Sequence, residues 1–314
     1  MRKYYGGIDL GGSFVKAGLL SAEGEPVSSL IVPASVEKGI PAVKANLREI
    51  GNKLIDLAIQ NHGDLIGIGV GSPGTIKYPE GIVTGATPNI PGWPGTNISE
   101  IFSDFPLKVV ADNDANCMGL AEALFGAGIG TSIGFYLTIG TGIGGAIIIN
   151  GKLHRGASFC AGEFGHTIFV YNGVQCKTGR RGCLEHYVNG SALVSATLEL
   201  IKLHPESVLA KARELITPKL IFEAFNQGDS VAQKAVAENA AMLGTAIGSA
   251  VNLLNPEIVV IGGGMALGGQ KYIELIKKAI FAFAFESTTS ALRVELAKFG
   301  NDAGWIGAAC LNIT

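Results

Sequence analysis

An α/β protein made of two similar lobes is the fold class that this sequence predicts, and three observations support it. The chain has 314 residues, more than a single hydrophobic core usually fills. Segments 6–20 and 136–149 share one order of an apolar run, a glycine-rich turn and a second apolar run. Strand and helix patterns alternate around both segments, and 47% hydrophobic residues with 45 glycines are typical of a well-packed α/β protein rich in tight turns.

The first half begins with a predicted β-hairpin at 6–20, where a strand, a tight loop and an antiparallel return strand follow one another. Apolar residues at helical spacing then predict a helix: Val43, Leu47, Ile50, Leu54 and Ala58. The apolar runs 65–71 and 107–112 indicate buried strands. A further helix is expected to begin at the Asn/Asp cluster 112–114, because these residues are the best helix caps.

The second half repeats this plan, with a hairpin expected at 136–149. Apolar spacing predicts helices over 220–225 and 231–254, and the segment 257–264 is expected to be a strand that ends in glycines. The expected N-terminal lobe comprises residues 1–113 completed by a C-terminal helix at 302–314, and the expected C-terminal lobe comprises residues 114–301.

Charge and composition favour a small-molecule partner over nucleic acid or a membrane. The formal net charge is −2 and no block of Lys or Arg stands out, so there is no field to attract a polyanion. The uncharged stretch 123–151 is interrupted by Gly, Ser and Thr, which favours buried strands over a membrane span. The N-terminus lacks the pattern of a secretory signal, so we expect a cytoplasmic protein. Five cysteines in a reducing compartment make disulfides improbable.

Three glycine-rich loops would present backbone N–H groups, which suit phosphates, toward a cleft between the two lobes. A single loop of this kind is equally consistent with an ordinary hairpin turn, because glycine is common in turns. Three such loops in one chain favour phosphate binding. The glycines at 140–145 also fit the GxGxxG pattern, yet a β-branched strand follows them where a dinucleotide-binding fold needs a helix. The loops are 11–13, 138–145 and 262–264.

Six motifs, in this order, resemble the ROK family of sugar kinases and sugar-responsive repressors. They are DLGGS at 9–13, DNDAN at 112–116, LTIGTGIGG at 137–145, GEFGH at 162–166, CKTGRRGCLE at 176–185 and NPEIVVIGGG at 255–264. The resemblance covers nearly the whole chain. It implies a two-lobed actin-like ATPase fold, related to ribonuclease H, with ATP and sugar bound between the lobes. It also implies transfer of the γ-phosphoryl group to a hexose hydroxyl, and a homodimer.

Phosphoryl transfer needs positioning, charge neutralisation by Mg²⁺ and a group that accepts the hydroxyl proton. Asp114 matches the family's catalytic base, although a helix cap alone would also explain an aspartate there. Asp9 resembles the acidic residue that orients Mg²⁺, through water, and a turn aspartate is its alternative. The resemblance assigns phosphate and nucleoside contacts to Gly11, Gly12, Ser13, Thr138, Gly140, Thr141, Gly142, Gly263 and Gly264.

A polar hexose site is implied by the remaining motif residues. Carboxylates and amides can pair with ring hydroxyls, and together they form a pocket although each alone is more often structural. Glucose is the expected substrate, and N-acetylhexosamine, mannose, allose and fructose kinases share the motifs. A sugar-sensing repressor is the alternative, disfavoured because Asp9 lies too near residue 1 to leave room for a DNA-binding domain. The implied sugar ligands are Gly74, Asn89, Asn113, Asp114, Glu163, His166 and Glu185.

A zinc site is only partly matched. The family's metal motif runs Gly-His and then Cys-x-Cys-Gly-x-x-Gly-Cys-x-Glu, and Thr178 occupies the position of the second cysteine. A neutral hydroxyl replaces a thiolate poorly, so we expect zinc to be held weakly or to be absent. His186, Cys160 or a water could supply a fourth ligand. The three matching ligands are His166, Cys176 and Cys183.

Overall fold

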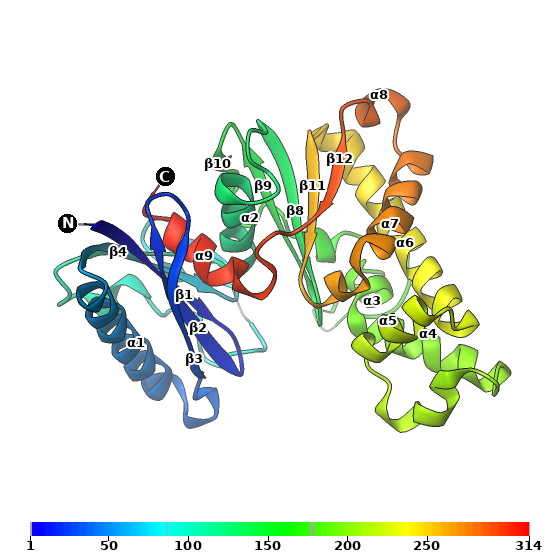
Figure 1. The fold of residues 1–314 in the computed structure, drawn as a ribbon, viewed down its shortest axis with the longest axis horizontal. Helices are drawn as coiled ribbons and strands as arrows, with labels where there is room; N and C mark the ends of the chain where they lie inside the picture. Colours follow the sequence, from blue (N-terminus) through cyan, green and yellow to red (C-terminus); the bar gives the residue numbers. More distant parts are fainter. Residues whose placement is uncertain (1, 86, 177–178, 314) are drawn as a thin grey trace. The chain divides into compact units, whose positions relative to one another are not determined.

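A computed structural model describes residues 2–85, 87–176 and 179–313 and divides into two compact units (Figure 1). Unit 1 comprises Met1–Ser132, Ala146–Gly162 and Lys298–Thr314, and unit 2 comprises Ile133–Gly145 and Glu163–Ala297. Residues 114–132, 146–162 and 298–301 therefore belong to unit 1, although they lie in the range expected for the C-terminal lobe.

Unit 1 is built on a five-stranded sheet of order β3-β2-β1-β4-β7. The first three strands are antiparallel neighbours, which confirms the hairpin predicted at 6–20, and β4 and β7 extend the sheet in parallel from β1. The strands are β1 (Arg2–Leu10), β2 (Phe14–Ser21), β3 (Pro26–Pro33), β4 (Gly63–Ser72) and β7 (Lys108–Asn113), and β5 (Ile76–Lys77) and β6 (Ile82–Val83) form a separate two-stranded sheet.

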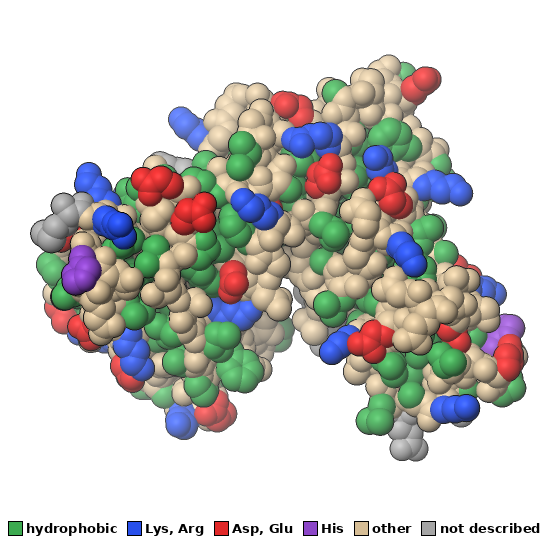
Figure 2. Space-filling view, in the orientation of Figure 1, with side chains coloured by type: hydrophobic (Ala, Val, Ile, Leu, Met, Phe, Trp, Pro, Cys, Tyr) green, Lys and Arg blue, Asp and Glu red, His purple; other side chains and the backbone are tan. Residues whose placement is uncertain are grey.

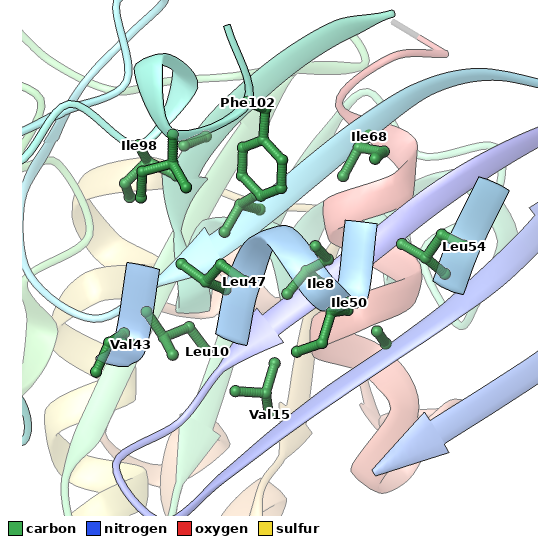
Figure 3. Close-up of a cluster of buried hydrophobic side chains, with 14 of the residues drawn as sticks. Ile8, Leu10, Val15, Val43, Leu47, Ile50, Leu54, Ile68, Ile98 and Phe102 are labelled. Carbon is green, nitrogen blue, oxygen red and sulfur yellow. The ribbon is translucent and has the colours of Figure 1, made fainter. Parts of the chain in front are cut away.

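Helix α1 (Ile40–Gln60) covers one face of this sheet, and all five residues of its predicted apolar stripe are buried. The stripe packs against alternate residues of the strands, including Ile8 and Leu10 of β1 (Figure 3). One face of the helix, with its spacing of three to four residues, and one face of the sheet, with its spacing of two, therefore form a single core. The strands predicted at 65–71 and 107–112 are confirmed as β4 and β7.

The C-terminal helix α9 (Ala303–Cys310) lies against the other face of the same sheet. Gly7 and Gly69 make this close approach possible, because a Cβ at either position would overlap a carbonyl oxygen, of Trp305 and of Ala308 respectively. Helix α2 (Asp114–Phe125) packs on α9. The chain's last segment is therefore part of the support beneath β1 and β4.

The second sheet has the order β10-β9-β8-β11-β12, which repeats the strand order of the first sheet and so confirms the internal duplication. The apolar run after Gly145 is the strand β9, as predicted when a dinucleotide-binding fold was rejected. The strands are β8 (Ile133–Ile139), β9 (Ile143–Ile149), β10 (Lys152–Leu153), β11 (Ile258–Gly262) and β12 (Arg293–Leu296).

Helices make up most of the rest of unit 2, and those predicted over 220–225 and 231–254 are confirmed. The α-helices are α3 (Glu185–Val188), α4 (Gly190–Leu203), α5 (Pro218–Gln227), α6 (Ser230–Leu254), α7 (Gly269–Phe283) and α8 (Glu286–Thr289). Short 3-10 helices occur at Val36–Lys38, Ser99–Phe102, Phe164–His166, Val208–Leu215, Gly264–Gly268 and Gly300–Asp302. Within the described residues, no helix is both long and apolar enough to cross a membrane.

Candidate active site

Asp114 lies at the junction where β7 ends and α2 begins. Asn113 is the N-cap of α2, as expected, and its side-chain oxygen accepts hydrogen bonds from the N–H groups of Ala115 (2.9 Å) and Asn116 (3.2 Å). Capping is therefore performed by Asn113, and Asp114 occupies the first position of the helix, where the helix dipole favours a negative charge. The Asp114 carboxylate, whose Oδ1 accepts from the Ala115 N–H (2.9 Å), therefore lies where a buried strand ends.

Two implied sugar ligands of unit 1, Asn113 and Gly74, meet at this junction. The side-chain amide of Asn113 donates to the carbonyl oxygen of Gly74 (3.1 Å), so these two are brought together. Asn89 is exposed and lies beside Gly12 of the first phosphate loop, since a Cβ at Gly12 would contact the Asn89 backbone at 3.5 Å. Sugar and phosphate candidates of this unit are thus neighbours.

Asp9 lies in β1 directly before the glycine loop, where Gly11 donates to the carbonyl of Phe14 (3.0 Å). Although Asp9 keeps some solvent contact, burial raises the pKa of its carboxyl to about 6, and the nearby charge of Lys16 partly opposes this rise. Lys16 is its direct partner in the β1–β2 register. The pairing of the two strands, and no local motif, places this residue beside the acid.

The second phosphate loop, in unit 2, is held by the helices that follow the cysteine motif. The side chain of Asn189 donates to the carbonyl of Thr141 (2.8 Å), and the Gly190 N–H donates to the carbonyl of Gly140 (2.8 Å). The loop is closed internally by the Gly140 N–H, which donates to the Gly142 carbonyl (2.9 Å). Asn189 was not singled out from the sequence, because it lies outside the six motifs quoted above.

A pocket of about 520 Å³ opens beside this loop. Gly263 has φ 82°, and its Cα lies so close to the Ile139 backbone that a side chain would collide with it. Thr138 pairs with Gly262 across β8 and β11, which places the third glycine loop next to the second. The pocket is lined by Gly140, Thr141, Gly190, Ser191, Val194, Ser195, Thr217, Pro218, Lys219, Gly264, Met265 and Leu267.

The three implied sugar ligands of unit 2 occupy one neighbourhood of local contacts. A carboxylate oxygen of Glu185 accepts from the Ile143 N–H (2.9 Å) and lies beside Gly142, so this acid is tied to the phosphate loop. Nε2 of His166 lies 3.8 Å from the exposed carboxylate of Glu163. Nδ1 of His166 is buried and has no hydrogen-bond partner among the described residues.

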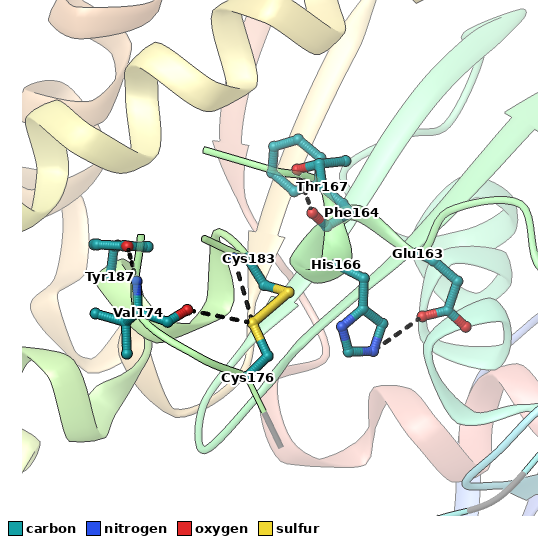
Figure 4. The surroundings of a disulfide bond; sticks show 8 residues. All are labelled: Glu163, Phe164, His166, Thr167, Val174, Cys176, Cys183 and Tyr187. Carbon is teal, nitrogen blue, oxygen red and sulfur yellow. Dashed lines mark hydrogen bonds and ion pairs between the residues drawn. A yellow bond between two sulfur atoms is a disulfide. The ribbon is translucent and has the colours of Figure 1, made fainter. Parts of the chain in front are cut away.

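Cys176 and Cys183 are joined by a disulfide, so the expectation that disulfides are improbable is wrong (Figure 4). The cause is a tight turn, in which the Cys176 N–H donates to the Arg180 carbonyl (2.6 Å) and Gly179 and Gly182 adopt left-handed backbone angles. It brings the two Cα atoms to 6.5 Å, within the range that a disulfide needs. The local turn, and not the compartment, sets the distance between these two cysteines.

The expected zinc ligands do not fit a metal ion in this form. Disulfide sulfurs are not thiolates, and the described residues contain no cluster of three or more His, Cys, Asp or Glu placed to bind a metal. Thr178, on which the zinc expectation depends, lies outside the described residues. In Figure 4 the His166 ring lies between the disulfide and Glu163.

Protein purified without added metal, chelator or reductant is expected to contain far less than one zinc per chain. Elemental analysis measures this directly, and a thiol assay in denaturant, before and after reduction, should show two additional thiols on reduction. One zinc per chain that resists mild chelation would contradict the expectation, and His186→Ala and Cys160→Ala would then identify the replacement ligand.

Arg155 is a charged residue of unit 1 that the sequence analysis missed. Its guanidinium binds the buried carboxylate of Asp112, with both Nε and Nη2 at 2.7 Å from Oδ2. A single arginine in a loop carries no sequence signal of its own, and 43 residues separate it from Asp112. The pair lies directly before Asn113 and Asp114 in the chain.

Comparisons with known proteins identify the family of the chain. The ROK family profile matches residues 5–314. The glucokinase of Halalkalibacterium halodurans is 35% identical, over 98% of this chain and 94% of that protein, and a xylose repressor of Caldicellulosiruptor bescii is 32% identical over 98% of this chain and 77% of the repressor. The crystal structure of a ROK family glucokinase from Streptomyces griseus in complex with glucose and AMPPNP has a TM-score of 0.84 at 30% identity, covering 98% of both chains. Fold, motifs and similarity over almost the whole length agree, and the chain belongs to the ROK family.

Proposed function

We propose that this protein is an ATP-dependent hexose kinase that converts glucose to glucose 6-phosphate, acting as a cytoplasmic homodimer. The observation that carries the proposal is the position of Asp114, an acid at the start of α2 whose neighbour Asn113 performs the capping. The likeness to glucokinases over nearly the whole of both chains supports the same reaction.

Asp114 serves as the base in this proposal. The sugar hydroxyl oxygen forms a bond to the γ-phosphorus, the bond from that phosphorus to the β–γ bridging oxygen breaks, and ADP leaves. The hydroxyl proton passes to the Asp114 carboxylate, which must therefore be ionised when the sugar binds. Asn113 supports this geometry, because its side chain fixes the first turn of α2 and also reaches Gly74.

The nucleotide is proposed to occupy the pocket beside Gly140, Thr141 and Gly264, whose volume of about 520 Å³ suits a ligand of that size. The loops at 11–13 and 138–142 would bind phosphate oxygens through backbone N–H groups. Asp9 fits a magnesium site, because Mg²⁺ prefers carboxylate oxygens and this acid is retained at a partly buried position. When bound, Mg²⁺ supplies neutralisation of the phosphate charge.

The hexose is proposed to be bound by the amides and carboxylates that the family motifs assign. In unit 1, the Asn113 side-chain amide and the Gly74 carbonyl are hydrogen-bonded to each other next to Asp114, and Asn89 lies beside Gly12. In unit 2, Glu185 is tied to the second phosphate loop, and His166 lies near Glu163. A site of paired polar groups rejects a sugar that lacks one hydroxyl, because a buried partner would then be left unpaired.

A sugar-sensing repressor is the second candidate function, favoured by the 32% identity to a xylose repressor. The face shown in Figure 2 has Lys and Arg side chains interspersed with Asp and Glu, and DNA binding instead needs a surface of one sign. A binding assay with the upstream region of sugar-utilisation genes at low salt tests this function, and specific DNA binding with no turnover of any sugar would overturn the kinase proposal.

Glucose is expected to give the highest kcat/KM in a coupled ADP-release assay over glucose, mannose, allose, fructose and N-acetylglucosamine. ADP release without sugar should be at least ~10²-fold slower, because water would lack the binding contacts that position the hexose. The same panel run with polyphosphate in place of ATP tests the phosphoryl donor. No turnover of any hexose with ATP would contradict the proposed function.

A further inference from the structure

We propose that Arg155 is a positioning residue for phosphoryl transfer: it compensates the buried Asp112 carboxylate and so holds the strand-to-helix turn that presents Asn113 and Asp114. The inference rests on the proposed function, within which Asp114 is the base. Arg155 lies outside all six family motifs quoted above.

The two oxygens of the Asp112 carboxylate have different partners, Arg155 on one side and the turn on the other. The side chain is 1% exposed, and its Oδ2 binds the guanidinium of Arg155 twice. Its Oδ1 accepts from the Asn113 N–H (2.7 Å) and from the side-chain amide of Asn116 (2.9 Å). A buried ionised carboxylate is tolerated only when it is paired in this way. One oxygen therefore meets the cation and the other meets the turn.

Arg155 is itself held in place from two sides. Its guanidinium carbon lies 3.7 Å from the centroid of the Tyr78 ring, a close cation–π contact, and its backbone carbonyl accepts from the Ala161 N–H (3.0 Å). Only 20% of its side chain is exposed. The Arg48–Asp104 pair of the same unit has comparable distances, but its side chains are 41% and 63% exposed, so it is a surface ion pair of little energetic weight.

Removing the guanidinium would leave Asp112 buried and unpaired, and the carboxylate would then take up a proton, draw in water or rotate away. Each response changes the acceptor that the Asn113 N–H and the Asn116 amide now use. Asn113 both caps α2 and binds the Gly74 carbonyl, so a displacement there moves the first turn of the helix and Asp114 with it. Small misplacements of a reacting group are costly in rate.

The test compares Arg155→Met with wild type in kcat and in the KM for glucose and for ATP. We expect kcat to fall at least ~10-fold, the KM for glucose to rise, and the KM for ATP to stay within about twofold, because the proposed nucleotide pocket is lined by unit 2 residues. Arg48→Met is the matched control, expected to keep kcat within about twofold. A kcat per folded molecule equal to wild type in Arg155→Met would overturn the inference.

A double variant separates positioning through Asp112 from direct contact with substrate. In Arg155→Met/Asp112→Asn the amide oxygen can still accept from Asn113 and no charge is buried, so kcat should be at least about fivefold higher than in Arg155→Met. A double variant no more active than Arg155→Met would overturn the inference and place Arg155 on the substrate. If Arg155→Met does not fold, Arg155→Lys replaces it, with an expected loss of about three- to tenfold in kcat, and a wild-type kcat would be the contrary result.

A readout that needs no activity distinguishes failure of this inference from failure of the proposed function. Amide hydrogen exchange over residues 112–118 should become at least ~10-fold faster in Arg155→Met and remain unchanged in Arg48→Met. Unchanged exchange in both variants would refute the inference whatever the enzyme's substrate. Inactivity of wild type on every hexose, with the exchange result as expected, would refute the function alone.

Discussion

Replacing Asp114 by Asn is expected to lower kcat at least ~10²-fold, the usual scale for losing a positioned proton acceptor. Asparagine has nearly the same shape and can still accept the Ala115 N–H that Asp114 Oδ1 binds at 2.9 Å. The turn and the cap formed by Asn113 should therefore remain, and glucose should still bind. Only the ability to take up the hydroxyl proton is lost.

Steady-state kinetics with glucose and ATP, together with glucose binding by calorimetry, separate these effects for Asp114→Asn. Asp104→Asn is the matched control, since it removes a carboxylate from an exposed ion pair of the same unit. Its kcat should stay within about twofold of wild type. A near-wild-type kcat for Asp114→Asn would remove this residue from the mechanism.

Replacing Asp9 by Asn is expected to impair magnesium-dependent catalysis and at the same time to stabilise the ligand-free protein at pH 8. Burial raises the pKa of Asp9 from 3.8 to about 6, so the folded protein binds its proton more tightly than the unfolded chain does. The associated stability is present at acidic pH and is lost as the pH rises through about 6. At pH 8 the charged carboxylate therefore reduces the free energy of unfolding, by about 1–3 kcal/mol.

Thermal unfolding of Asp9→Asn and wild type at pH 5 and pH 8 tests the stability part, and the advantage of the variant should be larger at pH 8. A magnesium titration of kcat tests the catalytic part, where a fall of at least ~10-fold is expected at saturating ATP. Asp64→Asn, an exposed acid of β4, should change neither result. A variant less stable than wild type at pH 8, or with an unchanged magnesium requirement, would contradict the assignment.

Local patterns in the sequence were sufficient to predict much of the fold. The apolar stripe from Val43 to Ala58 predicted α1 because helical spacing places these side chains on one face, and all of them are buried. The Asn/Asp cluster 112–114 predicted the start of α2 because short polar side chains can cap a helix, and Asn113 is the residue that does so. The repeated hairpins at 6–20 and 136–149 predicted the duplication, which both sheets then repeat as one strand order.

The sequence did not predict contacts that depend on turn geometry or that join residues far apart in the chain. The disulfide was judged by compartment, whereas the turn at Gly179–Gly182 decides how close Cys176 and Cys183 come. No local feature of Lys16 indicated its neighbour, whereas the β1–β2 register places it opposite Asp9.

By itself the sequence determined the elements, the glycine loops and the motif residues of the proposed site, because periodicity, capping and turn preferences act between near neighbours. The tertiary structure alone decided which charged side chains form ion pairs. Asp112 and Arg155 are 43 residues apart, and neither has a local feature that names the other. Desolvation likewise depends on all the surrounding chain, including α9 against β1, and it is this burial that raises the pKa of Asp9. Electrostatic environment is a property of the packed chain, and no segment of the sequence contains it.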